Sequence, residues 1–363
     1  MSKPKIAVIG LKGLPSFGGA ARVGESIIEE LKQEYDFTVY GTTSHTEKEG
    51  DLGGYKQIVF KQLPNKKLNS FYYYFLSAMH ALLFAKYDLI HMHHVDGGFM
   101  IPVLRLRYKV LGTSHGRPQE LDKWQKVRWF FIVSERLFLW FSNAVTVVAK
   151  PLGDTYQKLF SYQTDYIPNG IHLENEIDQS KPHGEGYLLF AAGRIMEIKG
   201  CHTFLEALNE LNYKGRVLIV GNTNQTKGYE ARLHQLAEGL NVEFLPLIKE
   251  KSVLYGLVQN ASLFVFPSLV ENMSIMMLEV ATMKTPLICS DIPQNKAVFD
   301  DDETLFFETE NAKDLAEKIQ TALSDENLMK QKIDNAYKKL VSDYSWVSIA
   351  ARYDGHYKKL LAK

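Results

Sequence analysis

Short apolar runs alternate with longer amphipathic segments along the whole chain. In the first half, the runs that we expect to form strands occupy residues 6–9, 37–40, 56–60, 89–93, 109–113, 144–148 and 164–167. In the second half, they occupy residues 187–191, 217–220, 242–244, 263–266 and 286–289. Apolar residues at helical spacing lie between these runs, for example in segments 21–33, 70–85 and 126–141. Strands that alternate with helices form parallel sheets covered by helices on both faces.

A polar stretch at residues 174–185 interrupts the alternation near the middle of the chain, and we expect a hinge there. The 363 residues are more than one ordinary domain holds and are enough for two domains with separate cores. We therefore predict two Rossmann-like domains of the α/β class, at residues 1–172 and 173–345. Ligands of open parallel sheets bind at the carboxyl ends of the strands, so this arrangement predicts a site in the cleft between the domains.

Composition indicates a globular protein of a reducing compartment. Hydrophobic residues make up 45% of the chain and charged residues 23%, which are ordinary globular values. Cys201 and Cys289 are the only cysteines of the sequence, too few for a disulfide framework, so we expect a cytoplasmic protein. We expect neither a cleavable signal segment nor a membrane span, because segments 71–85 and 127–149 are too short or too often interrupted by polar residues.

Charge is balanced over the whole chain but not within it. Residues 1–175 hold 21 Lys and Arg against 16 Asp and Glu, and the rest of the chain is acidic to the same extent. The basic half contains an aromatic run at 71–75. Its nearby cations are Lys66, Lys67, Arg105, Arg107 and Lys109. Basic charge beside aromatic side chains is typical of a surface that contacts anionic lipid, and a buried helix with solvated lysines is the alternative. Neither interpretation indicates nucleic acid, because no basic stripe or nucleic-acid-binding module is present.

Two segments of the second half carry side chains that suit a nucleotide-activated sugar. Arg194 and Lys199 lie in a loop after a predicted strand, where a guanidinium and an ammonium commonly divide the binding of phosphate oxygens. Glu271 precedes a predicted helix, and Glu279 lies about two turns inside it. An ionised carboxylate accepts hydrogen bonds from two neighbouring hydroxyls. Glu271 is therefore a candidate for the sugar and Glu279 for the ribose.

The residues between the two glutamates coincide with a helix start. Asn272, Met273 and Ser274 follow the apolar run 263–267, where a helix should begin. Unpaired amides at a helix N-terminus bind anions or hydroxyls. Each feature alone also fits ordinary surface charges or solvated helix residues, and it is the order and spacing of the whole set that favours a ligand site.

A glycine-rich loop follows the first predicted strand, from Gly10 to Gly18 and Gly19, and precedes a helix. Its amides can approach a donor phosphate or an acceptor closely. The glycine spacing differs from the dinucleotide fingerprint, and the second strand ends at Tyr40 and Gly41 without an acidic residue for a ribose. These differences argue against NAD.

The histidine and aspartate patterns argue against a metal. His91 and His93 would share one face of a strand beside His94, but no carboxylate-containing chelate motif completes the set. The aspartates at 300–302 fit a solvated turn better than a metal motif. We expect no metal and no other cofactor.

The ordered set of motifs resembles glycosyltransferase family 4, the retaining enzymes of GT-B fold, over nearly the whole chain. In chain order the motifs are Gly18-Gly19, Ser114-His115-Gly116, Val145-Thr146-Val147-Val148, Ile167-Pro168-Asn169-Gly170, Gly193-Arg194 to Lys199-Gly200, Glu271 with Glu279, and Trp346 to Tyr357. The resemblance implies two Rossmann-like domains with parallel sheets facing each other across a cleft. It also implies that the first domain binds the acceptor, that the second binds the donor, and that a helix at about 346–363 crosses back to the first.

The resemblance implies a role for each site residue. It assigns the donor diphosphate to Arg194 and Lys199, the transferred sugar to Glu271, the ribose to Glu279 and a place in the donor-sugar pocket to His115. The other donor-binding candidates are Gly18, Gly19, Gly193, Leu247, Asn272, Met273 and Ser274. Asn272 stands where the family usually has glycine, and this departure leaves the identity of the sugar open.

We therefore predict a retaining, metal-independent hexosyltransferase of bacterial surface polysaccharide biosynthesis. It would move a sugar from a UDP- or GDP-linked donor to a glycan or lipid-linked acceptor, in the cytoplasm or at the inner face of the membrane, with peripheral contact through its first domain. Two alternatives stay open. One is another enzyme of the same fold, such as a sugar-nucleotide epimerase or a phosphorylase. The other is a non-catalytic protein that binds sugar nucleotides, for which Asn272 is the only sequence support.

Overall fold

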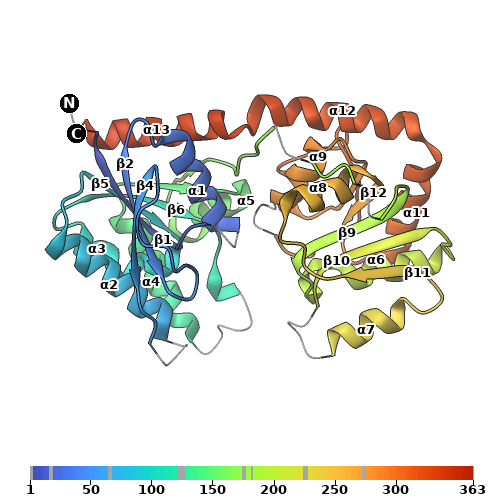
Figure 1. Cartoon of the computed structure of the whole chain (residues 1–363), viewed down its shortest axis with the longest axis horizontal. Coiled ribbons are helices and arrows are strands. Elements are labelled where there is room, and N and C mark those ends of the chain that lie inside the picture. The colour runs from blue at the N-terminus through green and yellow to red at the C-terminus, as the bar shows by residue number, and fades with distance from the viewer. Residues whose placement is uncertain are drawn as a thin grey trace. The chain divides into compact units, whose positions relative to one another are not determined.

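The computed structural model describes residues 3–15, 19–63, 68–120, 127–173, 177–180, 183–223, 228–271, 273 and 275–362. The chain forms two compact units (Figure 1). The first comprises Met1–Gly170 and Trp346–Lys363, and the second comprises Ile171–Ser345. The hinge expected at 174–185 falls at the start of the second unit, and part of it lies outside the described residues.

The first unit is built on an eight-stranded sheet. Its strands are β1 (Lys5–Lys12), β2 (Asp36–Thr42), β3 (Gly50–Asp51), β4 (Tyr55–Phe60), β5 (Leu89–His93), β6 (Lys109–Ser114), β7 (Ala144–Val147) and β8 (Asp165–Tyr166). They lie in the order β3-β4-β2-β1-β5-β6-β7-β8, and only the β3–β4 pair is antiparallel. β1 and β5 lie in the middle and are buried on both faces, which explains the continuous apolar run of β1 from Ile6 to Ile9, whereas β5 also buries His91 and His93.

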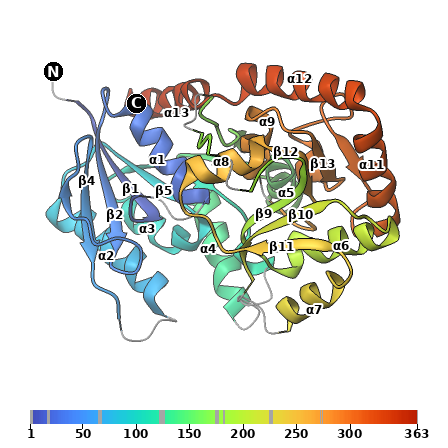
Figure 2. The same ribbon diagram turned by 45° about the vertical axis from the view of Figure 1, so that its right-hand side comes forward.

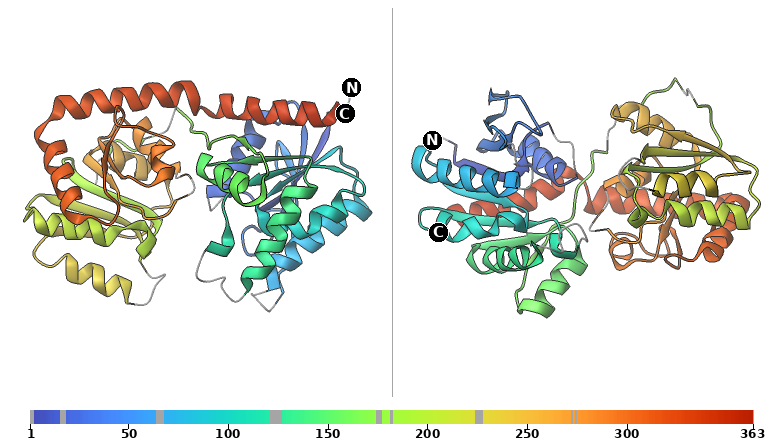
Figure 3. Two further views of the ribbon diagram at one scale, coloured as in Figure 1. Left: turned by 180° about the vertical axis from the view of Figure 1, so that it is seen from behind. Right: turned by 90° about the horizontal axis from the view of Figure 1, so that it is seen from below.

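Helices cover both faces of this sheet. The helices α2 (Asn69–Phe84), α3 (Ile101–Leu104), α4 (Arg128–Phe141) and α5 (Lys150–Phe160) share one apolar core with it. On the opposite face, α1 (Gly19–Leu31) packs beside α13 (Trp346–Leu361), the last helix of the chain. Figure 3 shows these layers from behind and from below.

Polar contacts from several side chains attach α13 to the rest of the first unit, among them Arg352, which donates to the carbonyl of Tyr166 in β8. The Tyr35 hydroxyl donates to Asp354 at 2.6 Å, and the Lys109 ammonium donates to the carbonyl of Leu360 at 2.8 Å. The hydroxyl of Tyr357, which is fully buried, hydrogen-bonds His91 Nδ1 of β5 at 2.8 Å. The segment that follows the second unit in the sequence is therefore part of the core of the first.

The second unit has a six-stranded, wholly parallel sheet. Its strands are β9 (Tyr187–Arg194), β10 (Arg216–Asn222), β11 (Asn241–Leu245), β12 (Ala261–Phe266), β13 (Leu287–Ser290) and β14 (Leu305–Phe307), in the order β11-β10-β9-β12-β13-β14. Its helices are α6 (Cys201–Glu210), α7 (Tyr229–Leu236), α8 (Lys251–Gln259), α9 (Ile275–Thr282), α10 (Pro293–Lys296), α11 (Ala312–Ser324) and α12 (Glu326–Asp343). One core joins α6, α7 and α11 to the sheet. Cys201 and Cys289 are both buried and free.

The predicted α/β class with parallel sheets is confirmed in both units. The short strands β3 and β14 were not predicted, since two or three residues at a sheet edge give no periodic pattern. The aromatic run 71–75 divides, because Tyr73 and Tyr74 are buried while Phe71 and Phe75 are exposed. Among the described residues, no helix is both long enough and apolar enough to cross a bilayer.

The first prediction concerns Gly10, where β1 touches the end of β5. Gly10 has a φ of 117°, and a Cβ added there would lie 2.0 Å from the carbonyl oxygen of His93. We expect Gly10→Ala to lower the free energy of unfolding by about 3 kcal/mol, measured by chemical denaturation. Gly355→Ala is the matched control, because Gly355 is exposed inside α13 and its Cβ would meet nothing within 4 Å. The control should gain up to about 1 kcal/mol from better helix propensity, and equal stability of the two variants would contradict the packing argument.

Candidate functional site

The site in the second unit lies where the strand connections change direction. From β9 the chain continues through β10 to β11 on one side of the sheet, whereas β12, the other neighbour of β9, leads through β13 to β14 on the opposite side. Figure 2 shows β9 and β12 with α8 and α9 beside them. Ligands of open parallel sheets bind outside the carboxyl ends of the strands at such a switch point.

The loop after β9 carries the two predicted cations. Gly193 and Arg194 are exposed at the carboxyl end of β9, and Lys199 ends a short 3-10 helix (Glu197–Lys199) just before α6. Ile195 is fully buried, and its amide donates to the carbonyl of Asn222 at the end of β10. This anchor fixes the loop at the edge of the sheet where the site was predicted.

A second loop, after β12, presses against the first. Gly200 has a φ of 67°, and a Cβ there would lie 1.9 Å from the carbonyl oxygen of Pro267. The amide of Leu269 also donates to the carbonyl of Ile198 at 2.9 Å. The glycine after Lys199 is therefore required for the two loops to touch.

This contact brings Lys199 and Glu271 together although 72 residues separate them. The Lys199 ammonium donates to Glu271 Oε1, and the Ser268 hydroxyl donates to the same oxygen at 2.9 Å. The side chain of Lys199 is 25% exposed and that of Glu271 is 10% exposed. Ser268 thus fixes the carboxylate of the pair, and both side chains stay partly exposed, so a ligand can reach them.

A small pocket adjoins this pair. It has a volume of about 90 Å³, and its lining includes Gly193, Lys199, Ser268 and Met276. The remaining lining comes from the ends of β9 and β12. The pocket is at the switch point, with an ammonium and a hydroxyl at its polar side.

Glu279 occupies a different environment from Glu271. It lies in α9, is 4% exposed, and accepts a hydrogen bond from the Tyr255 hydroxyl of α8 at 2.7 Å. Because α9 begins at Ile275, Glu279 lies just over one turn inside the helix rather than the two turns expected. No sequence signal links Tyr255 to Glu279, because the two residues come from separate helices.

The other predicted donor-binding residues are less closely grouped. Gly18, Asn272 and Ser274 lie outside the described residues. Met273 is buried two residues before the start of α9, Leu247 is 43% exposed after β11, and Gly19 is the first residue of α1 in the first unit. Within the described part of the chain, Arg194 forms no ion pair. The sequence analysis did not identify Ser268 as a site residue. A hydroxyl three residues before Glu271 is a local signal from which its contact with that carboxylate could have been predicted.

In the first unit, His115 belongs to a buried group of histidines. His93 Nδ1 and His115 Nε2 are joined by a hydrogen bond of 2.9 Å, and the rings of His94 and His115 lie 4.9 Å apart. Burial lowers the pKa of His91 to about 3 and the pKa of His93, His94 and His115 below the usual range. The four imidazoles are therefore neutral at pH 7. The described residues contain no group of three His, Cys, Asp or Glu side chains placed to hold a metal.

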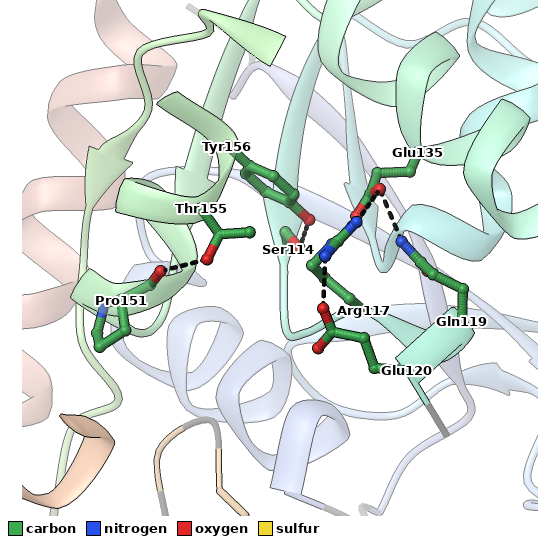
Figure 4. A network of polar contacts seen from close by, with 8 residues as sticks. All are labelled: Ser114, Arg117, Gln119, Glu120, Glu135, Pro151, Thr155 and Tyr156. Carbon is green, nitrogen blue, oxygen red and sulfur yellow. Dashed lines mark hydrogen bonds and ion pairs between the residues drawn. The ribbon is translucent and has the colours of Figure 1, made fainter. Parts of the chain in front are cut away.

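A polar network fixes the loop that carries His115 (Figure 4). The Arg117 guanidinium donates to both oxygens of Glu135, at 2.8 and 3.1 Å, and Gln119 donates to Glu135 Oε2 at 2.7 Å. The Glu135 side chain is fully buried in α4, where an unpaired carboxylate would be costly. The two donors therefore fix the loop after β6 to α4, a contact that the sequence analysis did not predict.

Sequence families match both halves of the chain. The family described as Glycosyltransferase Family 4 matches residues 17–175, and the family described as Glycosyl transferases group 1 matches residues 174–339. The chain belongs to the group 1, family 4 glycosyltransferases. Solved structures confirm the GT-B fold of this family member: sucrose-phosphate synthase from Thermosynechococcus elongatus has a TM-score of 0.83 at 22% identity and covers 99% of this chain and 100% of that one. HepE from Anabaena, in complex with UDP and glucose, has a TM-score of 0.77 at 16% identity over 98% of this chain and 100% of its own.

Curated relatives of this family member act in bacterial glycan synthesis. An N,N'-diacetylbacillosaminyl-diphospho-undecaprenol alpha-1,3-N-acetylgalactosaminyltransferase of Campylobacter jejuni is 26% identical over 60% of this chain and 55% of its own length. The capsular polysaccharide biosynthesis glycosyltransferase CapM of Staphylococcus aureus is 24% identical over 53% of this chain and 54% of its own. The chain thus matches about half the length of these relatives.

The second prediction follows from the neutral histidines of this family member. An unfolded histidine has a pKa near 6.5, so below pH 6.5 the unfolded chain binds more protons than the folded one. The contribution of these neutral imidazoles to the free energy of unfolding is therefore fully present above pH 6.5 and is lost as the pH is lowered. The loss is up to about 1.4 kcal/mol per pH unit for each buried imidazole. We expect His115→Asn to make this slope shallower between pH 6.5 and 5, measured by chemical denaturation at a series of pH values. An unchanged slope would show that His115 is not held neutral by burial.

Proposed function

We propose that the chain is a retaining glycosyltransferase that moves a sugar from a nucleoside-diphosphate sugar to a glycan or lipid-linked acceptor. The observation that carries this proposal is the Lys199–Glu271 pair beside the pocket at the β9–β12 switch point. A nucleotide sugar carries an anionic diphosphate between two sets of hydroxyls. A cation and a carboxylate fixed next to each other match that sequence of groups.

The proposed donor complex assigns one ligand group to each side chain. The diphosphate would attract Lys199, together with Arg194 from the same loop, and this would free Glu271 to accept hydrogen bonds from the sugar. Glu279, held by Tyr255, would accept from the ribose hydroxyls. HepE, which has the same fold, binds UDP and glucose, and this supports a uridine nucleotide as the first ligand to test.

The chemistry would proceed on one face of the sugar. The bond between the anomeric carbon and the diphosphate oxygen breaks, the acceptor oxygen attaches on the same face, and the acceptor proton passes to a donor phosphate oxygen. Negative charge accumulates on the leaving diphosphate, where Lys199 and Arg194 would stabilise it. We propose that these two cations replace a metal, so no metal would be required.

We further propose that the enzyme works in surface polysaccharide synthesis at the cytoplasmic face of a membrane. Two Campylobacter relatives are named for acceptors linked to undecaprenol, and CapM for capsular polysaccharide. Trp129, Val133 and Trp140 form an exposed stripe on α4, at 68%, 45% and 62% exposure. Tryptophan on one face of a helix is typical of the lipid interface, which supports peripheral contact through the first unit.

The third prediction tests transfer itself, by release of nucleoside diphosphate from UDP- or GDP-sugars in the presence of an undecaprenyl-diphosphate-linked sugar. Lys199→Ala should lower kcat/KM about 10²- to 10³-fold, the usual effect of a lost preorganised donor. Lys214→Ala, at an exposed lysine of the same unit, is the control and should leave the rate unchanged. EDTA should have no effect, and NMR of the product should show the donor's anomeric configuration. Nucleotide binding without acceptor-dependent release would contradict the transferase.

The fourth prediction tests the ribose contact in a binding assay. Glu279→Gln should weaken binding of the preferred nucleoside diphosphate about tenfold, but should weaken its 2′,3′-dideoxy analogue far less. Calorimetric titration measures both constants. Tyr255→Phe removes only the hydroxyl that donates to Glu279 and controls for disturbance of the α8–α9 contact. Equal losses for both ligands would place Glu279 away from the ribose.

A further inference from the structure

The first unit contains a second, larger pocket that the proposed donor site does not use. It has a volume of about 260 Å³ and lies where α2 and α4 begin, next to a 3-10 helix (Val95–Met100) that follows β5. Its apolar wall includes Phe71, Phe99, Val127, Trp129 and Phe130. We call it the aromatic pocket.

The wall of the aromatic pocket is preformed. The rings of Phe71 and Phe99 are stacked with centroids 4.7 Å apart, and the Phe130 centroid lies 5.5 Å from that of Phe99. Even so, Phe71 is 47% exposed, Val127 is 41% exposed and Trp129 is 68% exposed. A hydrocarbon ligand that covers this surface would gain about 25 cal/mol for each Å² removed from water.

The lining also has a polar part. The Lys12 ammonium, at the end of β1, donates to the hydroxyl of Ser70, which lines the pocket. Tyr74 is 1% exposed and lines the pocket with Asp96, and among the described residues neither the Tyr74 hydroxyl nor Asp96 Oδ1 has a hydrogen-bond partner. Buried polar groups normally find partners. A ligand with both hydroxyl and phosphate oxygens could accept from Tyr74 and donate to Asp96.

The polar part of the lining lies near the carboxyl ends of strands β1 and β5. Lys12 ends β1 and Asp96 follows β5 closely, so both stand at the carboxyl ends of parallel strands, where ligands of such sheets bind. The pocket is smaller than the roughly 300–1,000 Å³ that encloses a whole small ligand, and a stable protein partner needs about 800 Å² of contact. Its size therefore fits part of a hydrocarbon chain better than a protein segment.

We propose that the aromatic pocket binds the beginning of the hydrocarbon chain of a lipid-linked acceptor, with the attached phosphate directed toward Lys12. This inference rests on the proposed function, because it supplies the acceptor class for that reaction. The apolar wall would contact the hydrocarbon chain of such an amphiphile, and the polar part of the lining would contact the phosphate and the sugar that follow the chain. The pocket would hold the point where the hydrocarbon chain meets the phosphate. This point would lie near the carboxyl ends of β1 and β5 and the loop with His115 that follows β6.

Direct binding of farnesyl phosphate, below its aggregation limit, tests the pocket without a membrane. The full chain is titrated calorimetrically in the absence of nucleotide sugar, with inorganic phosphate as the ligand that lacks a chain. Phe71→Ser should raise the Kd at least tenfold, whereas Phe75→Ser should change it less than twofold. Both phenylalanines are exposed on α2, at 47% and 42%, but only Phe71 lines the pocket.

A second matched pair guards against an effect of one misfolded variant. Val127→Ser, in the pocket, should raise the Kd at least threefold, whereas Val133→Ser, at 45% exposure on α4 outside the pocket, should leave it unchanged. Failure of the wild-type chain to bind farnesyl phosphate, or equal effects within either pair, would overturn the proposal. Binding is measured without a donor, so a chain that binds farnesyl phosphate in this way but transfers no sugar would contradict only the proposed reaction.

Discussion

The close approach of Gly200 to the carbonyl of Pro267 is the contact on which the candidate donor site depends. Two loops that leave neighbouring strands come within van der Waals distance there, and only a residue without a Cβ at a φ of 67° allows it. The hydrogen bond between Leu269 and Ile198 closes the same contact. As a result, a cation and a carboxylate far apart in the sequence are fixed before any ligand arrives. Preorganisation of this kind is what electrostatic catalysis requires, because no reorganisation remains for the reaction step.

The first unit buries several ionisable side chains instead of presenting them to a ligand. Its strands β5 and β6 end in His93 and Ser114, which are fully buried, and burial keeps the histidines uncharged. The one fully buried carboxylate of this network, Glu135, receives donors from Arg117 and Gln119. The imidazoles and this compensated carboxylate therefore add little net charge to the first unit. The charged groups at the aromatic pocket are instead Asp96, in its lining, and Lys12, which donates to Ser70 of that lining.

Much of the fold follows from local sequence, because each strand and helix of ordinary length carries its own periodic pattern. The loop at Lys199 and the carboxylate at Glu271 were also predictable, since the glycine, the cations and the helix start occur in short motifs. The partners that hold them were not. Tyr255 reaches Glu279 from another helix, and Glu135 meets Arg117 from across a loop. Contacts of this type depend on tertiary packing, which a single sequence does not encode in any local spacing.

The position of α13 has a consequence for how the protein is made. This helix belongs to the first unit, where Tyr357 bonds His91 and Tyr353 is fully buried, yet it follows the whole second unit in the sequence. Domains generally fold as they leave the ribosome, starting from the N-terminus. Here the earlier half can collapse around its sheet but keeps an uncovered apolar face until residues 346–361 have been translated. The second unit should therefore reach its native state first. The first unit, although it is translated earlier, becomes fully folded only when α13 packs onto it.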